Sequence, residues 1–146
     1  MHPSWSFQHT EPCAVPPDFA WRYWTNVANW AIDSDIESVT LHGPFAAGSA
    51  GITRSRRSGE IHWTIASAHP GEAVIETPAP GAIARFRWRF EPAAPGAAGI
   101  TQLVQISGPG AAPLIAAFAP DLERGIPAGM KKLCEAMEHA LKASAA

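Results

Sequence analysis

Aromatic residues alternate with arginines between residues 84 and 90. In an extended strand, successive side chains point to opposite faces, so the aromatic residues share one face and the arginines the other. The aromatic face holds Phe86, Trp88 and Phe90, and the basic face holds Arg85, Arg87 and Arg89. This alternation is typical of an antiparallel sheet with one face in water, because strands covered on both faces are apolar almost throughout. Another element must therefore cover the three aromatic rings.

The same two-residue period predicts strands along much of the chain. Near the N-terminus, Trp5, Phe7 and His9 alternate with polar residues, which indicates a first strand with these three side chains inward. Further strands are predicted at residues 35–42, 50–57, 60–69, 72–77, 82–91 and 98–107. Turn-forming pairs such as Ser58-Gly59 and Pro70-Gly71 separate them.

Two other regions carry helical patterns. Pro16 and Pro17 suit the first turn of a helix, where a missing N–H costs nothing, so residues 17–31 are predicted to form one or two short helices. Towards the C-terminus, apolar residues follow the i, i+3, i+4, i+7 spacing of an amphipathic helix, and they are Met130, Leu133, Cys134, Met137 and Leu141. The upstream extension of this helix is predicted to break or kink near its middle, at Pro120, Gly125 and Pro127.

The order of these elements predicts an α+β fold of the helix-grip type, with residues 1–146 as one domain. A curved antiparallel sheet of about seven strands would wrap around a long, kinked C-terminal helix, with two short helices after the first strand. Only the segment 111–142 is long enough to cover the aromatic face of the sheet. Because a concave sheet cannot touch a kinked helix along its whole length, a cavity is expected between them.

Composition narrows the classes of function. The net charge of −2 gives no general attraction to nucleic acid or to an anionic membrane. The most apolar stretch, from Ala111 to Ala119, is too short for membrane insertion and contains Pro113. The N-terminus lacks the pattern of a signal peptide, so we expect a cytoplasmic protein. Cys13 and Cys134 fit no metal spacing and are interpreted as free thiols.

The arginines raise the question of nucleic-acid binding. Six of them could form a basic stripe on the outer face of the sheet, namely Arg54, Arg56, Arg57, Arg85, Arg87 and Arg89. Glu60 and the other acidic residues are expected to pair with them across strands, which would make this a solvated face. The aromatic rings that could stack on bases lie on the opposite face, so no nucleic-acid partner is predicted.

Several segments of the chain carry a family resemblance. In the first half they are Val27-Ala28-Asn29-Trp30, Asp33 to Ile36, Leu41-His42-Gly43-Pro44-Phe45, Gly48 and Gly51. In the second half they are Phe90-Glu91-Pro92, Gly99-Ile100-Thr101-Gln102, Ser107-Gly108-Pro109 and Leu122-Glu123-Arg124-Gly125-Ile126-Pro127. Together they resemble the SRPBCC (START-like, helix-grip) superfamily, in its polyketide cyclase/dehydratase-related branch. The resemblance implies an internal cavity that binds lipids, polyketides, sterols or hormones, and it does not fix a reaction.

Our first functional hypothesis is binding of a small hydrophobic or aromatic ligand, lipid-like or polyketide-like, between the sheet and residues 114–130. The predicted lining is Phe7, His9, Trp63, Phe86, Trp88, Phe118, Leu122 and Met130. Aromatic rings and methionine would supply contact area, and His9 would supply a polar anchor. The alternative is that the large rings simply fill the core.

Two other classes of function stay open at the level of the sequence. A polyketide cyclase or dehydratase would use the same cavity to position reacting carbons and would need one group to move a proton. The candidates are His9, whose alternative is a structural, hydrogen-bonded histidine, and Glu76 if it faces inward. A protein-interaction module would use a sheet edge or the arginine face, and a homodimer is a further possibility.

No metal ion or other cofactor is predicted. The histidines form neither a His-x-His pair nor a His-Glu-x-x-His motif, which are the common spacings of helical and strand metal sites. The chain also lacks a Ser-His-Asp order and a Gly-x-Ser-x-Gly turn. The small ligand is therefore the partner that the sequence predicts.

The two faces of strand 82–91 can be tested with a pair of alanine variants. Trp88→Ala should lower the free energy of unfolding by about 3–5 kcal/mol if the ring is packed core. If the ring lines a cavity, the loss should be about 1–2 kcal/mol, because fewer contacts disappear. Arg87→Ala, on the opposite face, should cost less than about 0.5 kcal/mol. Chemical denaturation measures both, and a larger loss for Arg87→Ala would mean that the faces are reversed.

Overall fold

Seven antiparallel strands form one sheet in the computed structural model, which describes residues 4–31 and 35–145. The strands are β1 (Trp5–Cys13), β2 (Ile36–His42), β3 (Ala50–Ser55), β4 (Gly59–His69), β5 (Glu72–Ala79), β6 (Ala82–Pro92) and β7 (Ala98–Ser107). The order across the sheet is β1-β7-β6-β5-β4-β3-β2, so β2 to β7 form a meander and β1 pairs with its last strand. The family motif from Asp33 to Ile36 lies partly outside the described residues.

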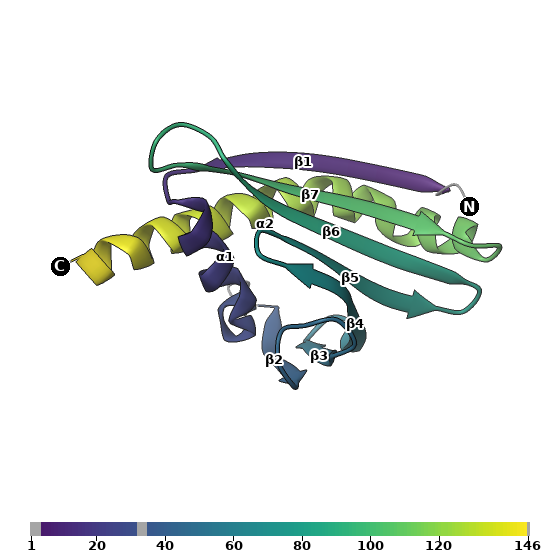
Figure 1. Ribbon diagram of the computed structural model, residues 1–146. Coiled ribbons are helices and arrows are strands. Elements are labelled where there is room, and N and C mark those ends of the chain that lie inside the picture. Colours follow the sequence, from purple (N-terminus) through teal and green to yellow (C-terminus); the bar gives the residue numbers. More distant parts are fainter. Residues whose placement is uncertain (1–3, 32–34, 146) are drawn as a thin grey trace.

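Helices occupy the two regions that the sequence predicts. Helix α1 (Pro17–Thr25) and the 3-10 helix η1 (Val27–Trp30) join β1 to β2, and α2 (Ala111–Ala145) follows β7. The sheet curves around α2, as Figure 1 shows. The predicted helix-grip α+β fold is therefore confirmed.

The C-terminal helix contains two of its prolines, Pro120 and Pro127, in its interior. Of the break or kink predicted at Pro120, Gly125 and Pro127, the break does not occur, because α2 is continuous through both prolines. Each proline removes one backbone hydrogen bond. Packing of Ile126 and Met130 in the core holds the helix together across the interruption, and such tertiary contacts contribute more to helix stability than local propensity.

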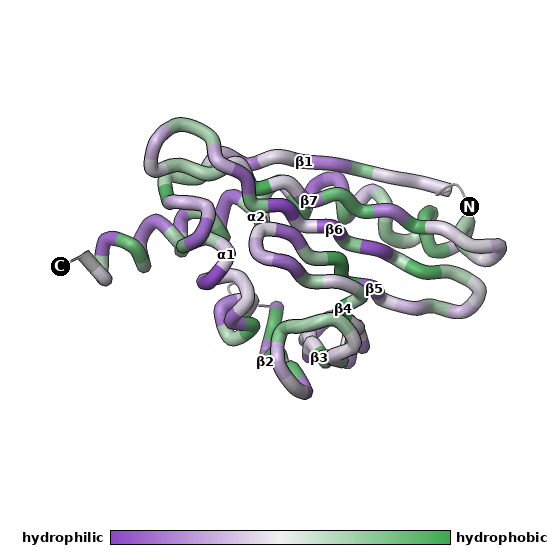
Figure 2. Tube along the Cα trace, viewed as in Figure 1, coloured by the Kyte–Doolittle hydropathy of each residue, from purple (hydrophilic) through white to green (hydrophobic). Residues whose placement is uncertain are grey.

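Helix α2 lies mainly along one edge of the sheet. Most of its contacts with the sheet are to β1, and fewer are to β7 and β6. In its C-terminal half, Met130, Leu133, Cys134 and Met137 are buried at the predicted spacing. Hydrophobic and hydrophilic segments accordingly alternate along this half of the helix (Figure 2). The strands on the far side of the sheet are therefore not covered by α2 directly.

The faces of β6 are those that its alternation predicts. Phe90 is buried, Phe86 and Trp88 pack against the core, and Arg85 and Arg87 are exposed. On the exposed face, the arginines pair with carboxylates. The pairs are Arg85–Glu76 and Arg87–Glu72 at 2.6 Å, Arg54–Glu60 at 2.7 Å, and Arg56–Glu37, Arg57–Asp35 and Arg89–Glu91 at 3.9 Å. All six arginines of the expected stripe thus have acidic neighbours, so this face carries both signs of charge.

A glycine makes room for one of the large inner rings. Gly51 in β3 lies opposite Trp63 in β4, and a methyl group on Gly51 would overlap the six-membered ring of the indole. The indole Nε1 donates a hydrogen bond to Thr53 Oγ1 at 3.0 Å, which holds the ring across β3. Trp63 is 4% exposed, so the ring has little freedom to move aside.

Gly51→Ala should therefore lower the free energy of unfolding by about 1–3 kcal/mol, the usual cost of overpacking a core. Gly99→Ala in β7 is the matched control, since its methyl group would meet only Thr10 Cγ2, at an ordinary 3.8 Å. We expect the control to change stability by no more than about 0.5 kcal/mol. Chemical denaturation measures both variants, and equal losses would contradict a steric role for Gly51.

Candidate ligand-binding pocket

A cavity of about 400 Å³ lies between the sheet and α2. Helix α1 and η1 contribute Trp24 and Trp30, five strands contribute Thr53, Trp63, Ile75, Thr77, Phe86, Trp88 and Gln102, and α2 contributes Asp121, Leu122, Gly125, Ile126, Gly129, Met130 and Leu133. The strands concerned are β3 to β7. The edge strand β1 is absent from the lining because α2 lies along it.

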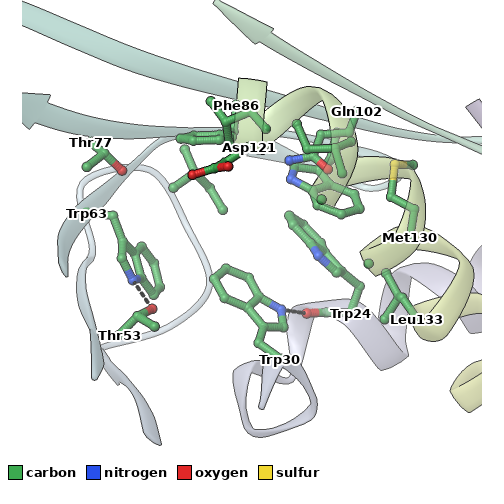
Figure 3. A pocket seen from close by; sticks show the side chains of 16 residues that line it. Trp24, Trp30, Thr53, Trp63, Thr77, Phe86, Gln102, Asp121, Met130 and Leu133 are labelled. Carbon is green, nitrogen blue, oxygen red and sulfur yellow. Dashed lines mark hydrogen bonds between the residues drawn. The ribbon is translucent and has the colours of Figure 1, made fainter. Parts of the chain in front are cut away.

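Four indole rings form a continuous wall of the cavity. Trp63 and Trp30 have ring centroids 5.0 Å apart, Trp30 and Trp24 follow at 5.3 Å, and Trp24 and Trp88 at 5.0 Å. Figure 3 shows Trp24, Trp30 and Trp63 grouped around the open space. Such a wall offers flat apolar surface and the negative faces of aromatic rings.

Hydrogen bonds fix the orientation of two of these rings. Trp30 Nε1 donates to the carbonyl oxygen of Trp24 at 2.6 Å, and Trp63 Nε1 donates to Thr53 Oγ1 at 3.0 Å. A rotation of either ring would break its hydrogen bond inside a largely apolar site, which costs free energy. The two rings are therefore held in place by the protein itself.

Two exposed glycines border the cavity on the helix side. Gly125 and Gly129 lie one turn apart on α2, and a methyl group on either would meet no atom within 4 Å beyond the backbone of the helix itself. Leu122, Ile126 and Met130 surround them on the same side of the helix. The sequence presents Gly125 as a helix breaker and as part of a family motif, and it gives Gly129 no role. The two glycines are four residues apart, and their spacing follows that of the apolar lining residues of α2. This spacing is the sequence signal that could have identified them as lining residues.

Polar groups are few in the lining. They are Thr53, Thr77, Gln102 and Asp121. Of these, only Asp121 carries an ionisable side chain, and that side chain is 69% exposed and pairs with Arg124 at 2.6 Å. The site therefore has an acidic group at its solvent boundary and neutral groups elsewhere among its described residues.

The structure brings together five of the eight predicted lining residues. Trp63, Phe86, Trp88, Leu122 and Met130 line the cavity. The lining also contains residues that the sequence did not predict, among them two tryptophans and a glutamine: Trp24, Trp30 and Gln102. Short-range pattern assigns the two tryptophans to a short helix but gives no sign of where that helix packs.

The other three predicted residues lie outside the cavity lining. Phe7 and His9 are on β1, where α2 takes up the inner face of the sheet. His9 Nε2 is 2.9 Å from Glu11 Oε1 on the same strand. Phe118 is on α2 before the lining residues begin, and it is 49% exposed.

Glu76 faces away from the cavity. Its neighbours Ile75 and Thr77 line the pocket, so Glu76 points to the outer face of β5. There it accepts hydrogen bonds from Arg85 Nε and Nη2 at 2.8 and 2.6 Å. The carboxylate is thus part of the ion pairs on the solvated face.

The two cysteines lie together in the hydrophobic core. Both are buried and free, and Cys13 Sγ donates to the carbonyl oxygen of Cys134 at 3.8 Å. Interaction of the Cys134 thiol with the side chain of Cys13, followed by burial, raises the pKa of Cys134 above its ordinary value. Cys134 is therefore protonated at neutral pH, which makes it a poor nucleophile. Among the residues described, no three His, Cys, Asp or Glu side chains gather as a metal site.

The open space above the helix glycines predicts a gain in stability. Gly125→Ala should raise the free energy of unfolding by about 0.5–1 kcal/mol, because alanine favours the helix and its methyl group meets nothing. Ala128→Gly, an exposed position of the same helix, is the reverse control and should lower stability by a similar amount. Thermal denaturation measures both, and a loss of stability in Gly125→Ala would show that the wall has no free space there.

Comparisons with known proteins agree with this architecture. A family model described as "Polyketide cyclase / dehydrase and lipid transport" matches residues 4–145. A search of curated proteins finds no match. In the described part of the chain, no helix combines the length and apolar character that crossing a membrane requires.

Solved structures with the same fold include enzymes and other proteins. The Zhui aromatase/cyclase from Streptomyces sp. R1128 has a TM-score of 0.77 at 16% identity, covering 96% of this chain and 97% of its own. Ara h 8.0201 has a TM-score of 0.75 at 15% identity, covering 92% and 98%. Norcoclaurine synthase from Thalictrum flavum, in complex with dopamine and hydroxybenzaldehyde, has a TM-score of 0.72 at 12% identity, covering 94% and 87%. With the family match spanning nearly its whole length, the chain belongs to the polyketide cyclase/dehydrase and lipid transport family.

Proposed function

We propose that this protein binds a small hydrophobic or aromatic ligand in the pocket between the sheet and α2. The observation that carries the proposal is the wall of four indole rings around a cavity of about 400 Å³. Ligand sites are typically concave and apolar, have volumes of about 300–1,000 Å³, and contain a few placed polar groups. Both the size and the lining of this pocket fall within that description.

The rigidity of the wall supports binding rather than simple filling of the core. Hydrogen bonds hold Trp30 and Trp63, and Gly51 leaves the space in which Trp63 lies. A preorganised site loses little conformational freedom on binding, which improves affinity. On the helix side, the exposed Gly125 and Gly129 place no side chain in the space, at a cost to helix stability.

The character of the lining favours binding over proton-transfer catalysis. A cyclase or dehydratase would need a group to move a proton beside the reacting carbons. The ionisable group among the described lining residues is Asp121, which is mostly exposed and paired with Arg124. The candidates from sequence, His9 and Glu76, engage Glu11 and Arg85 instead.

Similar proteins supply a precedent for the class of ligand. The description of the family includes lipid transport, and the norcoclaurine synthase structure holds two small aromatic molecules, dopamine and hydroxybenzaldehyde. Both kinds of molecule are compatible with an apolar pocket. The indole wall of the present chain favours a flat aromatic ligand over a flexible fatty chain, because ring faces gain from offset stacking.

The proposal can be tested with N-phenyl-1-naphthylamine, a neutral aromatic probe whose emission rises in apolar surroundings. We expect a saturable rise in probe emission and a parallel fall in tryptophan emission, because four indoles border the site. Gly125→Leu should weaken binding at least about tenfold, equivalent to about 1.4 kcal/mol, since the new side chain enters the cavity.

Ala128→Leu is the matched control, because Ala128 is an exposed residue of the same helix outside the lining. It should leave the affinity for the probe unchanged. Failure of the wild-type protein to bind the probe, or equal weakening by the two leucine variants, would count against a ligand site in this cavity.

A further inference from the structure

One buried polar side chain in the described residues is without a partner. Three polar residues are buried there, and two of them are paired: Ser55 Oγ with Asp35 Oδ2 at 2.6 Å, and Thr101 Oγ1 with Thr10 Oγ1 at 2.8 Å. The third, Gln102, is 8% exposed, and its carboxamide makes no hydrogen bond with the protein. Gln102 therefore differs from the other two in having its hydrogen-bonding capacity free.

The carboxamide of Gln102 is accessible from the pocket. No fully enclosed side-chain nitrogen or oxygen in the described part of the chain lacks a partner, so the unpaired amide must retain some accessible surface. Gln102 lines the cavity, and Figure 3 shows it among the pocket side chains. The free donor and acceptor groups are thus presented to whatever occupies the cavity.

The position of Gln102 in the sheet is one where an apolar residue would be expected. Its neighbours on the inner face of β7 are Ile100, Val104 and Ile106, all fully buried. An amide without a protein partner loses part of its hydration at such a position, whereas an apolar side chain of similar size has none to lose. A polar residue without a structural partner at this point is explained by a partner that arrives with the ligand.

We infer that Gln102 is the specificity-determining anchor of the pocket, and that it selects aromatic ligands carrying a neutral hydroxyl or carbonyl group at their buried end. This inference rests on the proposed binding function. Gln102 lies opposite Trp88 in the pairing of β6 with β7. A ring stacked against the Trp88 indole would therefore bring its substituent next to the amide.

The electrostatics of the lining disfavour an anionic group at that end. No cationic side chain lines the pocket among the described residues, and the charged group present is the carboxylate of Asp121. A ligand carboxylate would lose its hydration there without gaining a counter-charge. A carboxamide donates and accepts, so it satisfies a hydroxyl or a carbonyl group equally well.

The contribution of Gln102 to ligand selectivity can be measured by comparing the affinities of two ligands for the wild-type protein and for a Gln102 variant. The ligands are 2-naphthol and 2-methylnaphthalene, which have similar shape but differ by a hydroxyl group, and their affinities are measured by displacement of N-phenyl-1-naphthylamine. In the wild-type protein the ratio of the two affinities includes the hydrogen bond to Gln102. In Gln102→Met, of similar length, the preference for 2-naphthol should fall by about three- to tenfold, as expected for loss of one hydrogen bond.

Gln105→Met is the matched control, since Gln105 is on the same strand but its side chain points to the other face of the sheet. It should leave the preference unchanged, and chemical denaturation should show that both variants are folded. A second comparison uses only the wild-type protein: 2-naphthoate should bind at least about tenfold more weakly than 2-naphthol, because its charge is uncompensated.

The outcomes separate the inference from the function on which it rests. If the naphthalene ligands bind but Gln102→Met keeps the wild-type preference, or if 2-naphthoate binds as tightly as 2-naphthol, the anchoring role of Gln102 is overturned and the pocket stands. If neither the probe nor any naphthalene ligand binds, the proposed binding function is overturned together with the inference.

Discussion

A long helix can touch a curved sheet along only one line, and in this protein that line runs beside β1. The C-terminal half of α2 inserts Met130, Leu133 and Met137 into the core from this position. The curvature of the sheet then carries the inner faces of β3 to β6 away from the helix. The space left between them must be filled by side chains, by α1 and η1, or by a ligand.

Large aromatic residues fill only part of the space between the helix and the sheet. Trp24 and Trp30, brought in by α1 and η1, pack against Trp88 and Trp63 from the sheet, so the rings line the space as a wall. Flat, rigid rings pack poorly into a curved volume, so space remains between them. Hydrogen bonds also fix the orientations of two of these rings, Trp30 and Trp63. Because Gly125 and Gly129 have no side chains, α2 does not fill the remaining space at these two positions.

The sequence predicts the strands well because period two is a local property. The alternation of Phe86 and Trp88 with arginine identifies both the strand and its inner face without knowledge of its neighbours. It does not reveal where along the sheet the helix lies. Phe7 and His9 satisfy the same pattern as Trp88, yet only Trp88 faces the cavity, since α2 covers the β1 edge.

For residues of the C-terminal helix, local propensity alone gives an incomplete prediction, because packing in the core also matters. Proline and glycine lower local helix propensity, which predicts a break or kink near Gly125. Burial of Ile126 and Met130 keeps the helix continuous there. Likewise, Gln102 looks in sequence like an ordinary polar residue of a strand. Its meaning depends on the absence of a partner, which only the packed structure makes visible.

The row of indoles also has an optical consequence. Transition dipoles on aromatic rings whose centroids are 5.0–5.3 Å apart interact strongly, so Trp63, Trp30, Trp24 and Trp88 absorb light as a coupled set rather than as four independent chromophores. The near-ultraviolet circular dichroism of such a set depends on the angles between its rings. A small rotation of one ring changes the signal of them all, which gives this protein an internal reporter of the shape of its cavity.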